Sequence, residues 1–363
     1  MERRKFLKIL GGGAVALPIA EMIPFLGKLA SNSVYATTAY RILSSPYVWW
    51  EPLEYARYAG IFKKHSAKHG VTVNLERLPK YSPSIDQYVQ GNAQGVAITN
   101  MDALIGPAVG GVDTEVIYVG DTSHGNDGIL LRNGKTCKDL KGRTVRLVEN
   151  SVSHYLLASA LKSCGLTLRD VRTTNIDDDK IVSAYQNDRD QKAAVVTWNP
   201  YLLQLRLERN TTMVFDSSMI PGEIIDMVVV RTDTPDAVKR AIVGAVYETM
   251  RLLSGKGPKA DAALRYMAKV SEGTLDEFKA QMSTTNIFYD PAQAVAFTKS
   301  KELKATMEKV RTFSFAQGIF GQGVKSKDYV GIQFPDGTAM GDPKNVKLRF
   351  NATYMQLAAE GKL

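Results

Sequence analysis

The sequence predicts a two-lobed α/β fold with a hinge, followed by extra C-terminal helices. Short β-branched runs alternate with helical patterns over residues 40–231, which is typical of βαβ units. This alternation occurs in two successive sets, so the chain contains two α/β units in series. Beyond residue 234 the pattern becomes almost purely helical. Such helices must cover apolar surface supplied elsewhere, and we expect the first unit to supply it.

The first unit follows the N-terminal 36 residues. Its β-branched runs predict strands at Tyr40–Ser44, Thr72–Leu78, Val96–Thr99 and Glu115–Gly120. The segments between them have apolar residues at helical spacing and predict helices at Pro52–His69, Ser84–Gly91 and Asp102–Ala108. Strands that alternate with helices in this way predict a mainly parallel sheet.

The second unit repeats the pattern. It predicts strands at Gly128–Leu131, Thr144–Val148, Val171–Thr174 and Ala193–Thr197. Its expected helices are Ser153–Ser163, Ile181–Asp188 and Pro200–Leu207. A further β-branched run, Ile224–Arg231, then leads into helices expected at Pro235–Leu253, Lys259–Val270, Thr274–Gln281, Pro291–Thr298 and Leu303–Gln317.

This order predicts that the chain crosses between the lobes twice, near Asp127 and near Asp226. We expect one lobe to contain residues 37–126 and 227–318, and the other to contain residues 127–226. The remaining residues, 319–363, form a C-terminal extension rich in Gly, Lys and Pro that we expect to pack on the surface. Two crossovers form a hinge, and a cleft at a hinge suits ligand capture by closure.

The composition is that of an ordinary globular protein. Of 363 residues, 44% are hydrophobic and 23% are charged, which argues against wholesale disorder and against a multispan membrane protein. The formal net charge is +9, but the basic residues are scattered along the chain. Nucleic-acid binding is therefore not expected, because it calls for a basic block or stripe.

The first 36 residues predict an export signal of the twin-arginine type that is cleaved after Ala36. Arg3 and Arg4 form a basic pair, and a weakly apolar run follows from Ile9 to Leu29. Glycines, a proline and Glu21 interrupt this run, which argues against a stable membrane span. We therefore expect a periplasmic protein, with a retained N-terminal anchor as the alternative.

Cysteine and histidine contribute little to the functional prediction. A disulfide between Cys137 and Cys164 would close a loop of about 27 residues and add roughly 3 kcal/mol, but the sequence does not establish it. His65 and His69 have the i, i+4 spacing of metal ligands. They lie in a lysine-rich stretch, which favours a solvated helix face over a metal site.

The candidate binding residues stand just after the predicted strands, where ligands bind in open α/β sheets. All three tryptophans, Trp49, Trp50 and Trp198, occur at such positions. Aromatic faces in a cleft attract cations, with about 0.5–2 kcal/mol per contact. The alternative for Trp49 or Trp50 is simple packing beneath the following helix.

Acidic residues gather at the same strand ends and crossovers. Helix N-termini favour anions, so carboxylates placed there offset the helix dipoles and leave the cleft negative. A cationic ligand is therefore predicted, although any single acid could simply cap a helix. The expected polar ligand contacts are Glu51, Asn100, Asp102, Asp127, Glu149, Glu223 and Asp226.

Motifs for catalysis are missing from the sequence. There is no Gly-x-Ser-x-Gly elbow, no phosphate-binding Gly-x-x-x-x-Gly-Lys, and no Gly-x-Gly-x-x-Gly after a strand. Asp127 and Glu149 could exchange protons, but nothing supplies a nucleophile or a metal. We therefore expect a binding protein without a cofactor rather than an enzyme.

Three segments resemble a known family over most of residues 40–317. They are Tyr58-Ala59-Gly60-Ile61-Phe62, Val96-Ala97-Ile98-Thr99-Asn100 and Asp139-Leu140-Lys141-Gly142-Arg143-Thr144-Val145. The chain resembles the periplasmic solute-binding proteins of ABC transporters that include the nitrate, sulfonate and taurine binders. The resemblance implies a periplasmic binding protein fold, type II-like, and a monomer that delivers its ligand to a permease in the inner membrane.

Further segments look most like one branch of that family, the branch associated with urea carboxylase. They are residues 99–103, 125–128, 151–155 and 196–200. That branch is implied to import guanidine, or urea. Guanidinium is flat, cationic and rich in donors, which suits carboxylates and aromatic faces.

Two competing functions remain at this stage. A sulfonate or nitrate binder on the same fold would need Arg or Lys at the binding positions, and none of the candidate residues named above is basic. An enzyme related to the thiamine-pyrimidine synthases would carry their cysteine-rich motif, which is absent.

Overall fold

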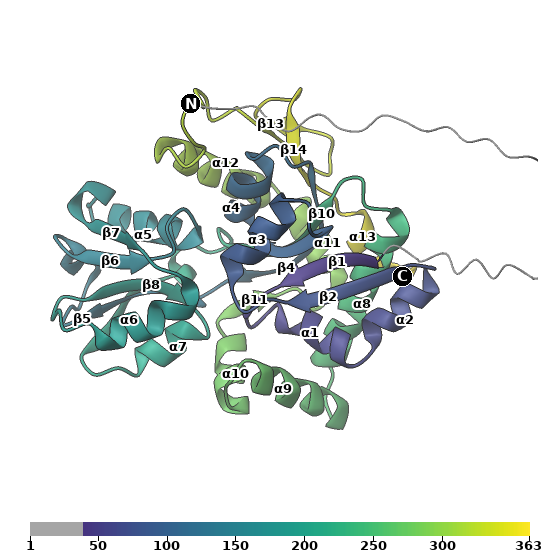
Figure 1. Cartoon of the computed structure of the whole chain (residues 1–363), viewed down its shortest axis with the longest axis horizontal. Helices are drawn as coiled ribbons and strands as arrows, with labels where there is room; N and C mark the ends of the chain where they lie inside the picture. Colours follow the sequence, from purple (N-terminus) through teal and green to yellow (C-terminus); the bar gives the residue numbers. More distant parts are fainter. Residues whose placement is uncertain (1–38) are drawn as a thin grey trace, which may run out of the picture. The chain divides into compact units, whose positions relative to one another are not determined.

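The computed structural model describes residues 39–363, which belong to one compact unit. The predicted export signal, residues 1–36, lies outside the described residues. Figure 1 shows two β-sheets, each with its own helices, joined by crossing segments. We refer to them as the nine-stranded lobe and the five-stranded lobe. No helix of residues 39–363 has the length and apolar character needed to cross a membrane.

The nine-stranded lobe contains the first part of the described chain and all of it after the second crossover. Its strand order is β13-β12-β14-β4-β10-β3-β1-β2, and β11 pairs with β4. The strands are β1 (Ala39–Ser44), β2 (Thr72–Arg77), β3 (Gly95–Thr99), β4 (Thr114–Ser123), β10 (Ile225–Arg231), β11 (Thr285–Ile287), β12 (Gly331–Gln333), β13 (Ala339–Met340) and β14 (Val346–Phe350). The helices are α1 (Glu51–Tyr58), α2 (Ile61–Lys68), α3 (Tyr81–Val89), α4 (Asn100–Ala103), α8 (Asp236–Ser254), α9 (Pro258–Val270), α10 (Leu275–Met282), α11 (Pro291–Thr298), α12 (Lys301–Ala316) and α13 (Thr353–Ala359).

The five-stranded lobe has the strand order β7-β6-β8-β5-β9. Its strands are β5 (Asp127–Arg132), β6 (Thr144–Leu147), β7 (Arg172–Asn175), β8 (Ala194–Trp198) and β9 (Thr211–Asp216). Three helices pack against this sheet, namely α5 (Val152–Ser163), α6 (Ile181–Asn187) and α7 (Tyr201–Arg206). The sequence did not predict β9, because most of its residues are only half-buried and its apolar signal is weak.

Both sheets are mixed rather than mainly parallel. β1, β2 and β3 are parallel, as are β6, β7 and β8. The strands next to the crossovers break this pattern, since β10 is antiparallel to β3 and β4, and β5 is antiparallel to β8 and β9. The chain enters and leaves each lobe through these strands, so their direction reverses relative to their neighbours.

Local signals explain where several helices begin. Thr274 and Glu277 form a capping box at the start of α10, and Ser300 accepts a hydrogen bond from the backbone of Leu303 at the start of α12. The single helix predicted at Pro52–His69 is instead two helices, α1 and α2. They are separated at Gly60, whose φ of 72° is a left-handed conformation that ends a helix.

The two crossovers lie side by side and are tied together by hydroxyl groups. Ser123 at the end of β4 has its Oγ 2.6 Å from the Oγ of Ser217. The backbone N–H of Gly125 also donates to Ser217 Oγ at 2.7 Å, and the N–H of Ser123 donates to the carbonyl of Ile224 at 3.0 Å. This arrangement forms a hinge from two adjacent chain segments.

The C-terminal extension is part of the nine-stranded sheet, so the prediction that it packs on the surface was wrong. β14 is parallel to β4, a fully buried strand, and β12 is parallel to β14. Leu348 and Met355 are completely buried. The strands of this extension were not predicted, because they are short and are separated by glycines, lysines and prolines.

The structure also bears on the predictions for the histidines and the cysteines. His65 is buried rather than solvated, and its Nε2 lies 2.8 Å from the Glu248 carboxylate on α8. Cys137 and Cys164 are free thiols in the structure. Burial, together with the neighbouring Cys137, raises the pKa of Cys164 to about 12.

We expect Leu348→Ala to lower the free energy of unfolding by about 2–5 kcal/mol, because it opens a cavity beside β4. Chemical denaturation measures the change. Lys344→Ala, at an exposed position in the same extension, is the control and should change stability by less than about 0.5 kcal/mol. Equal effects from the two variants would contradict the placement of β14 in the sheet.

Candidate functional site

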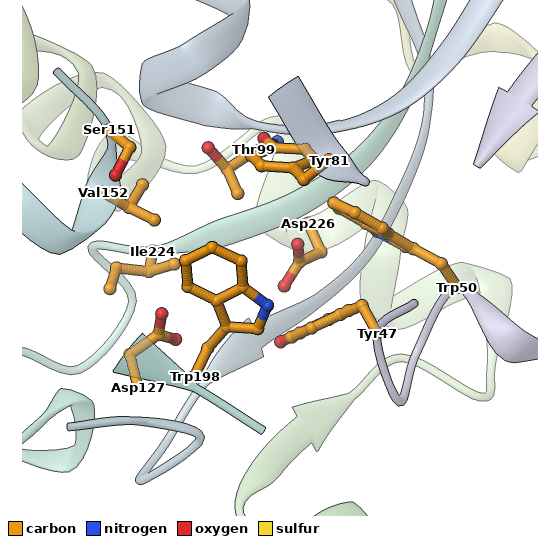
Figure 2. A pocket seen from close by; sticks show the side chains of 10 residues that line it. All are labelled: Tyr47, Trp50, Tyr81, Thr99, Asp127, Ser151, Val152, Trp198, Ile224 and Asp226. Atoms are coloured by element: carbon orange, nitrogen blue, oxygen red, sulfur yellow. Dashed lines mark hydrogen bonds between the residues drawn. The ribbon is translucent and has the colours of Figure 1, made fainter. Parts of the chain in front are cut away.

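A cavity of about 350 Å³ lies at the hinge and takes its walls from both lobes. Tyr47, Trp50, Tyr81, Thr99 and Asp226 belong to the nine-stranded lobe. The five-stranded lobe and the crossover contribute Asp127, Ser151, Val152, Trp198 and Ile224. Figure 2 shows these ten side chains converging from separate elements. Such a cavity, enclosed by aromatic and acidic side chains from two lobes, suits a small ligand.

Four aromatic rings form a continuous series along the cavity. The ring centroids of Tyr47 and Trp50 are 5.0 Å apart, and those of Trp50 and Tyr81 are 5.2 Å apart. Tyr81 in turn lies edge-on to Trp198 at 6.2 Å. Trp198 comes from the five-stranded lobe and the other three rings from the nine-stranded lobe, so aromatic surface faces the cavity from both sides. Ring faces carry negative potential and favour flat or cationic ligands.

Asp127 brings a carboxylate from the first residue of β5. Its side chain is buried, and its Oδ2 accepts a hydrogen bond from Ser123 Oγ at 2.6 Å. Burial raises the pKa of Asp127 to about 7, against the opposing effect of the Ser123 hydrogen bond. The Asp127 carboxyl group therefore changes between its protonated and ionised forms near neutral pH.

Asp226 brings the second carboxylate, from β10 in the nine-stranded lobe. Burial and the nearby charge of Asp127 raise the pKa of Asp226 to about 7, while hydrogen bonds from Tyr47 and Asp121 act in the other direction. Figure 2 shows this carboxylate among the rings of Tyr47, Trp50 and Trp198. The two carboxylates lie on opposite lobes and face one cavity.

Asp102 stands behind the cavity wall and does not line it. Its Oδ2 accepts hydrogen bonds from Tyr81 Oη at 2.7 Å and from Thr99 Oγ1 at 2.8 Å, and both of these residues face the cavity. Burial raises the pKa of Asp102 to about 6 despite these hydrogen bonds. Asp102 therefore fixes the orientation of Tyr81 and adds negative charge close to the site.

Among residues 39–363, no Lys, Arg or His lines this cavity. Nor does any cationic group contribute to the pKa shifts of Asp102, Asp127 or Asp226, which arise from burial, neighbouring acids and hydroxyl donors. The described residues also contain no group of three or more His, Cys, Asp or Glu side chains placed to hold a metal ion. The site is thus acidic and without a counter-charge of its own.

Three other residues expected at the site lie outside the cavity. Glu51 is buried in an ion pair with Arg77, with Oε1 2.7 Å from Nη2. Asn100 holds the second crossover, since its Oδ1 accepts from the N–H of Ile225 at 3.1 Å. Glu149 is partly exposed, and its backbone N–H donates to a side chain in β7.

Trp49 and Glu223 also lie next to the cavity rather than in its wall. Trp49 packs edge-on to Tyr289, with ring centroids 5.8 Å apart, and lines a second, adjoining cavity. Glu223 accepts hydrogen bonds from Tyr155 on α5 and from Lys309 on α12, so its carboxylate connects the two lobes outside the ligand cavity. The structure therefore brings together Trp50, Trp198, Asp127 and Asp226, with Asp102 directly behind.

Several cavity residues were missed by the sequence prediction. Tyr81 lies just beyond the end of β2. It would have been a candidate if the residues that follow this predicted strand had been considered together with those that follow the other strands. Tyr47 and Ser151 stand in strand-end segments but are common residue types with no distinctive pattern. Val152 and Ile224 carry no sequence signal, because apolar residues are expected anywhere in the core.

A comparison with protein-family models shows which family this chain belongs to. A model described as NMT1/THI5 like matches residues 55–318. The chain belongs to the NMT1/THI5-like family. The match spans both lobes and ends just after α12, so the family assignment includes every residue of the cavity except Tyr47 and Trp50.

Curated relatives match a shorter stretch. A protein from Brucella abortus (strain 2308), named as a binding protein, is 27% identical over 126 residues, and a protein from Brucella suis biovar 1 matches equally well. The matched stretch covers 32% of this chain and 39% of the relatives' own length.

Solved structures identify the fold. The sulphonate-binding protein SsuA from Escherichia coli has a TM-score of 0.64 at 16% identity, covering 79% of this chain and 94% of its own. SsuA from Xanthomonas axonopodis pv. citri, bound to MOPS, has a TM-score of 0.62 at 16% identity, covering 78% and 94%. A Candida albicans protein with the generic periplasmic binding protein fold has a TM-score of 0.60 at 12% identity, covering 78% and 93%. The predicted two-lobed periplasmic binding protein fold is confirmed.

We expect the ligand-free protein to lose stability as the pH rises from about 4 to 7. Asp102, Asp127 and Asp226 have pKa values of about 6 to 7 in the folded state, against 3.8 as the usual value, so the folded state holds protons that the unfolded state releases. Each such proton contributes about 1.4 kcal/mol per pH unit. Denaturation at several pH values measures the slope, and Asp127→Asn should make it shallower. A stability that stays level or rises over this range would contradict the protonation of these acids.

Proposed function

We propose that this protein is the periplasmic solute-binding component of an ABC importer, and that it closes on guanidinium. One observation carries the proposal. Asp127 and Asp226, from opposite lobes, face one small cavity that has aromatic walls and no cationic side chain from residues 39–363. Closure of the lobes around a small cation would bring both carboxylates to it, so the ligand would favour the closed state.

Guanidinium matches the chemistry of this cavity. It is planar, carries one delocalised positive charge and has only N–H donors, which pair with carboxylates in its plane. Its flat faces can lie against the rings of Trp50 and Trp198. Asp127 keeps an oxygen free for the ligand, because its hydrogen bond from Ser123 engages only Oδ2.

Sulfonates and urea are the alternatives on the same fold. Two of the structural relatives are named as sulfonate-binding proteins, and one of them holds MOPS. A sulfonate needs positive charge or several donors, whereas ionised Asp127 and Asp226 would repel it. Urea has the shape of guanidinium but no charge, so it could donate hydrogen bonds to the ionised carboxylates without neutralising their charge. Guanidinium is the ligand that uses all the features of the site.

The role in transport is supported by the relatives and by the N-terminal sequence. The relatives are named as binding proteins, and the solved structures include periplasmic ones. The twin-arginine pattern before Ala36 favours export. We therefore propose delivery to a permease in the inner membrane, with a monomeric binding protein that leaves its ligand unchanged. Incubation with guanidinium followed by its full recovery would separate binding from the enzymatic alternative.

We expect guanidinium chloride at low millimolar concentration to raise the thermal unfolding midpoint. A ligand at 100 times its dissociation constant adds about 2.7 kcal/mol to stability. Sodium chloride at equal concentration controls for ionic strength, and taurine, nitrate and urea test the alternatives. A midpoint raised by taurine or nitrate but not by guanidinium would overturn the proposal.

A titration with guanidinium tests the Asp127 carboxylate, which comes from the five-stranded lobe. Asp127→Asn removes a charge from the ligand cavity, and we expect at least a tenfold weaker binding of guanidinium by titration calorimetry. Asp276→Asn, on the exposed side of α10, is the matched control and should bind as the parent does. Unchanged binding in Asp127→Asn would remove Asp127 from the site.

We expect Glu223→Gln to weaken guanidinium and methylguanidine by the same factor. Glu223 connects Tyr155 on one lobe to Lys309 on the other, so its loss would lower the population of the closed state without changing the cavity. Calorimetry with both ligands gives the ratio of their dissociation constants. A changed ratio would show that Glu223 contacts the ligand directly.

A further inference from the structure

A second cavity of about 280 Å³ adjoins the ligand cavity and shares Trp50 and Asp226 with it. Its other walls include Trp49, Tyr118 and Asp121. In the described part of the chain, the indole nitrogens of Trp49 and Trp50 and the Oδ1 of Asp121 are buried without a hydrogen-bond partner. Asp226 therefore separates two cavities, and Asp121 stands on the side away from the ligand.

Asp121 and Asp226 lie directly opposite each other on β4 and β10. They are register partners in an antiparallel pair, and they are 1% and 3% exposed. Two like charges at opposed positions repel each other, and burial strengthens the repulsion. Among residues 39–363, no Lys, Arg or His lines the second cavity to neutralise them. Two carboxyl groups in such a position are compatible only if one of them carries a proton.

We propose that Asp121 is a positioning residue: its carboxyl group keeps a proton, donates it in a hydrogen bond to Asp226, and holds Asp226 as the ionised acceptor that faces the ligand. This inference rests on the proposed function, because Asp226 is the residue it positions. Asp121 does not touch the ligand cavity.

The surroundings of Asp121 favour this assignment of the proton. The titratable groups that influence or border it are the carboxyls of Asp226 and Asp127 and the phenols of Tyr47 and Tyr118. Burial and the charge of Asp226 raise the pKa of Asp121 well above its usual range, whereas the hydrogen bond from Asp121 lowers the pKa of Asp226. Both effects place the proton on Asp121 and the negative charge on the side of the ligand.

The proposal also fits the charge of the ligand. Asp102, Asp121, Asp127 and Asp226 form a buried acidic group, while guanidinium brings a single positive charge. Were all four acids ionised, three negative charges would remain uncompensated in a buried site. A permanently protonated Asp121 removes one of these charges and also supplies a donor to Asp226.

The test compares Asp121→Leu with Asp121→Asn by titration calorimetry with guanidinium chloride at pH 7.5. Asp121→Leu removes the hydrogen bond to Asp226, and we expect about tenfold weaker binding. Asp121→Asn keeps a neutral donor of the same shape and should restore binding to within about threefold of the parent. Binding in Asp121→Asn as weak as in Asp127→Asn would overturn the proposal, because Asp121 would then act as a charge.

A second measurement does not depend on any ligand. Between pH 5 and 6, Asp121 should be protonated in the folded state and ionised in the unfolded state, which makes the unfolding constant rise tenfold per pH unit from this group alone. Asp121→Asn should remove that tenfold contribution, whereas Asp276→Asn should not. An unchanged pH slope in Asp121→Asn would refute the buried proton. If the parent protein fails to bind guanidinium, the proposed function fails, and this slope still decides whether Asp121 holds a proton.

Discussion

Burial of aspartates without a counter-charge is the constraint on which the site depends. Asp102, Asp121, Asp127 and Asp226 are each at most 4% exposed, and no basic side chain among the described residues compensates them. An isolated carboxylate in such surroundings is unstable and keeps its proton instead. The same chain pairs other buried acids with bases, as Glu115 with Lys239. The lack of basic side chains beside these aspartates is therefore a property of the cleft and not of the fold as a whole.

The hinge explains how these acids come together. Asp121 and Asp226 lie on the two central strands that lead to the crossovers, and Asp127 is the first residue after one of them. The hydroxyl groups of Ser123 and Ser217 join the two crossovers, and the Ser123 hydroxyl also donates a hydrogen bond to Asp127. Hinge geometry and ligand charge are thus set by the same few residues, so a change in hinge angle would alter the environment of the carboxylates.

The sequence predicted the fold and part of the site, for a physical reason. Strand ends converge at one edge of a sheet, so the positions of Trp50, Asp127, Trp198 and Asp226 follow from strand order. Glu51 also follows a strand end, but its carboxylate forms an ion pair with Arg77, 26 residues away in the sequence. No local sequence pattern reveals that pairing. The strands of the C-terminal extension were missed because they depend on pairing with β4 and β12 rather than on their own composition.

Charge therefore provides a route from binding to closure. In the proposed closure, the Asp127 carboxylate of one lobe would move towards Asp226 of the other, and without a cation this would require a proton on at least one of them. In the function proposed above, a proton and a guanidinium would compete for the same negative charge, but only guanidinium would also fill the space between the aromatic walls. Neutral or anionic molecules of similar size do not relieve the repulsion between the lobes. Selectivity would then arise from the electrostatics of closure as much as from direct hydrogen bonds to the ligand.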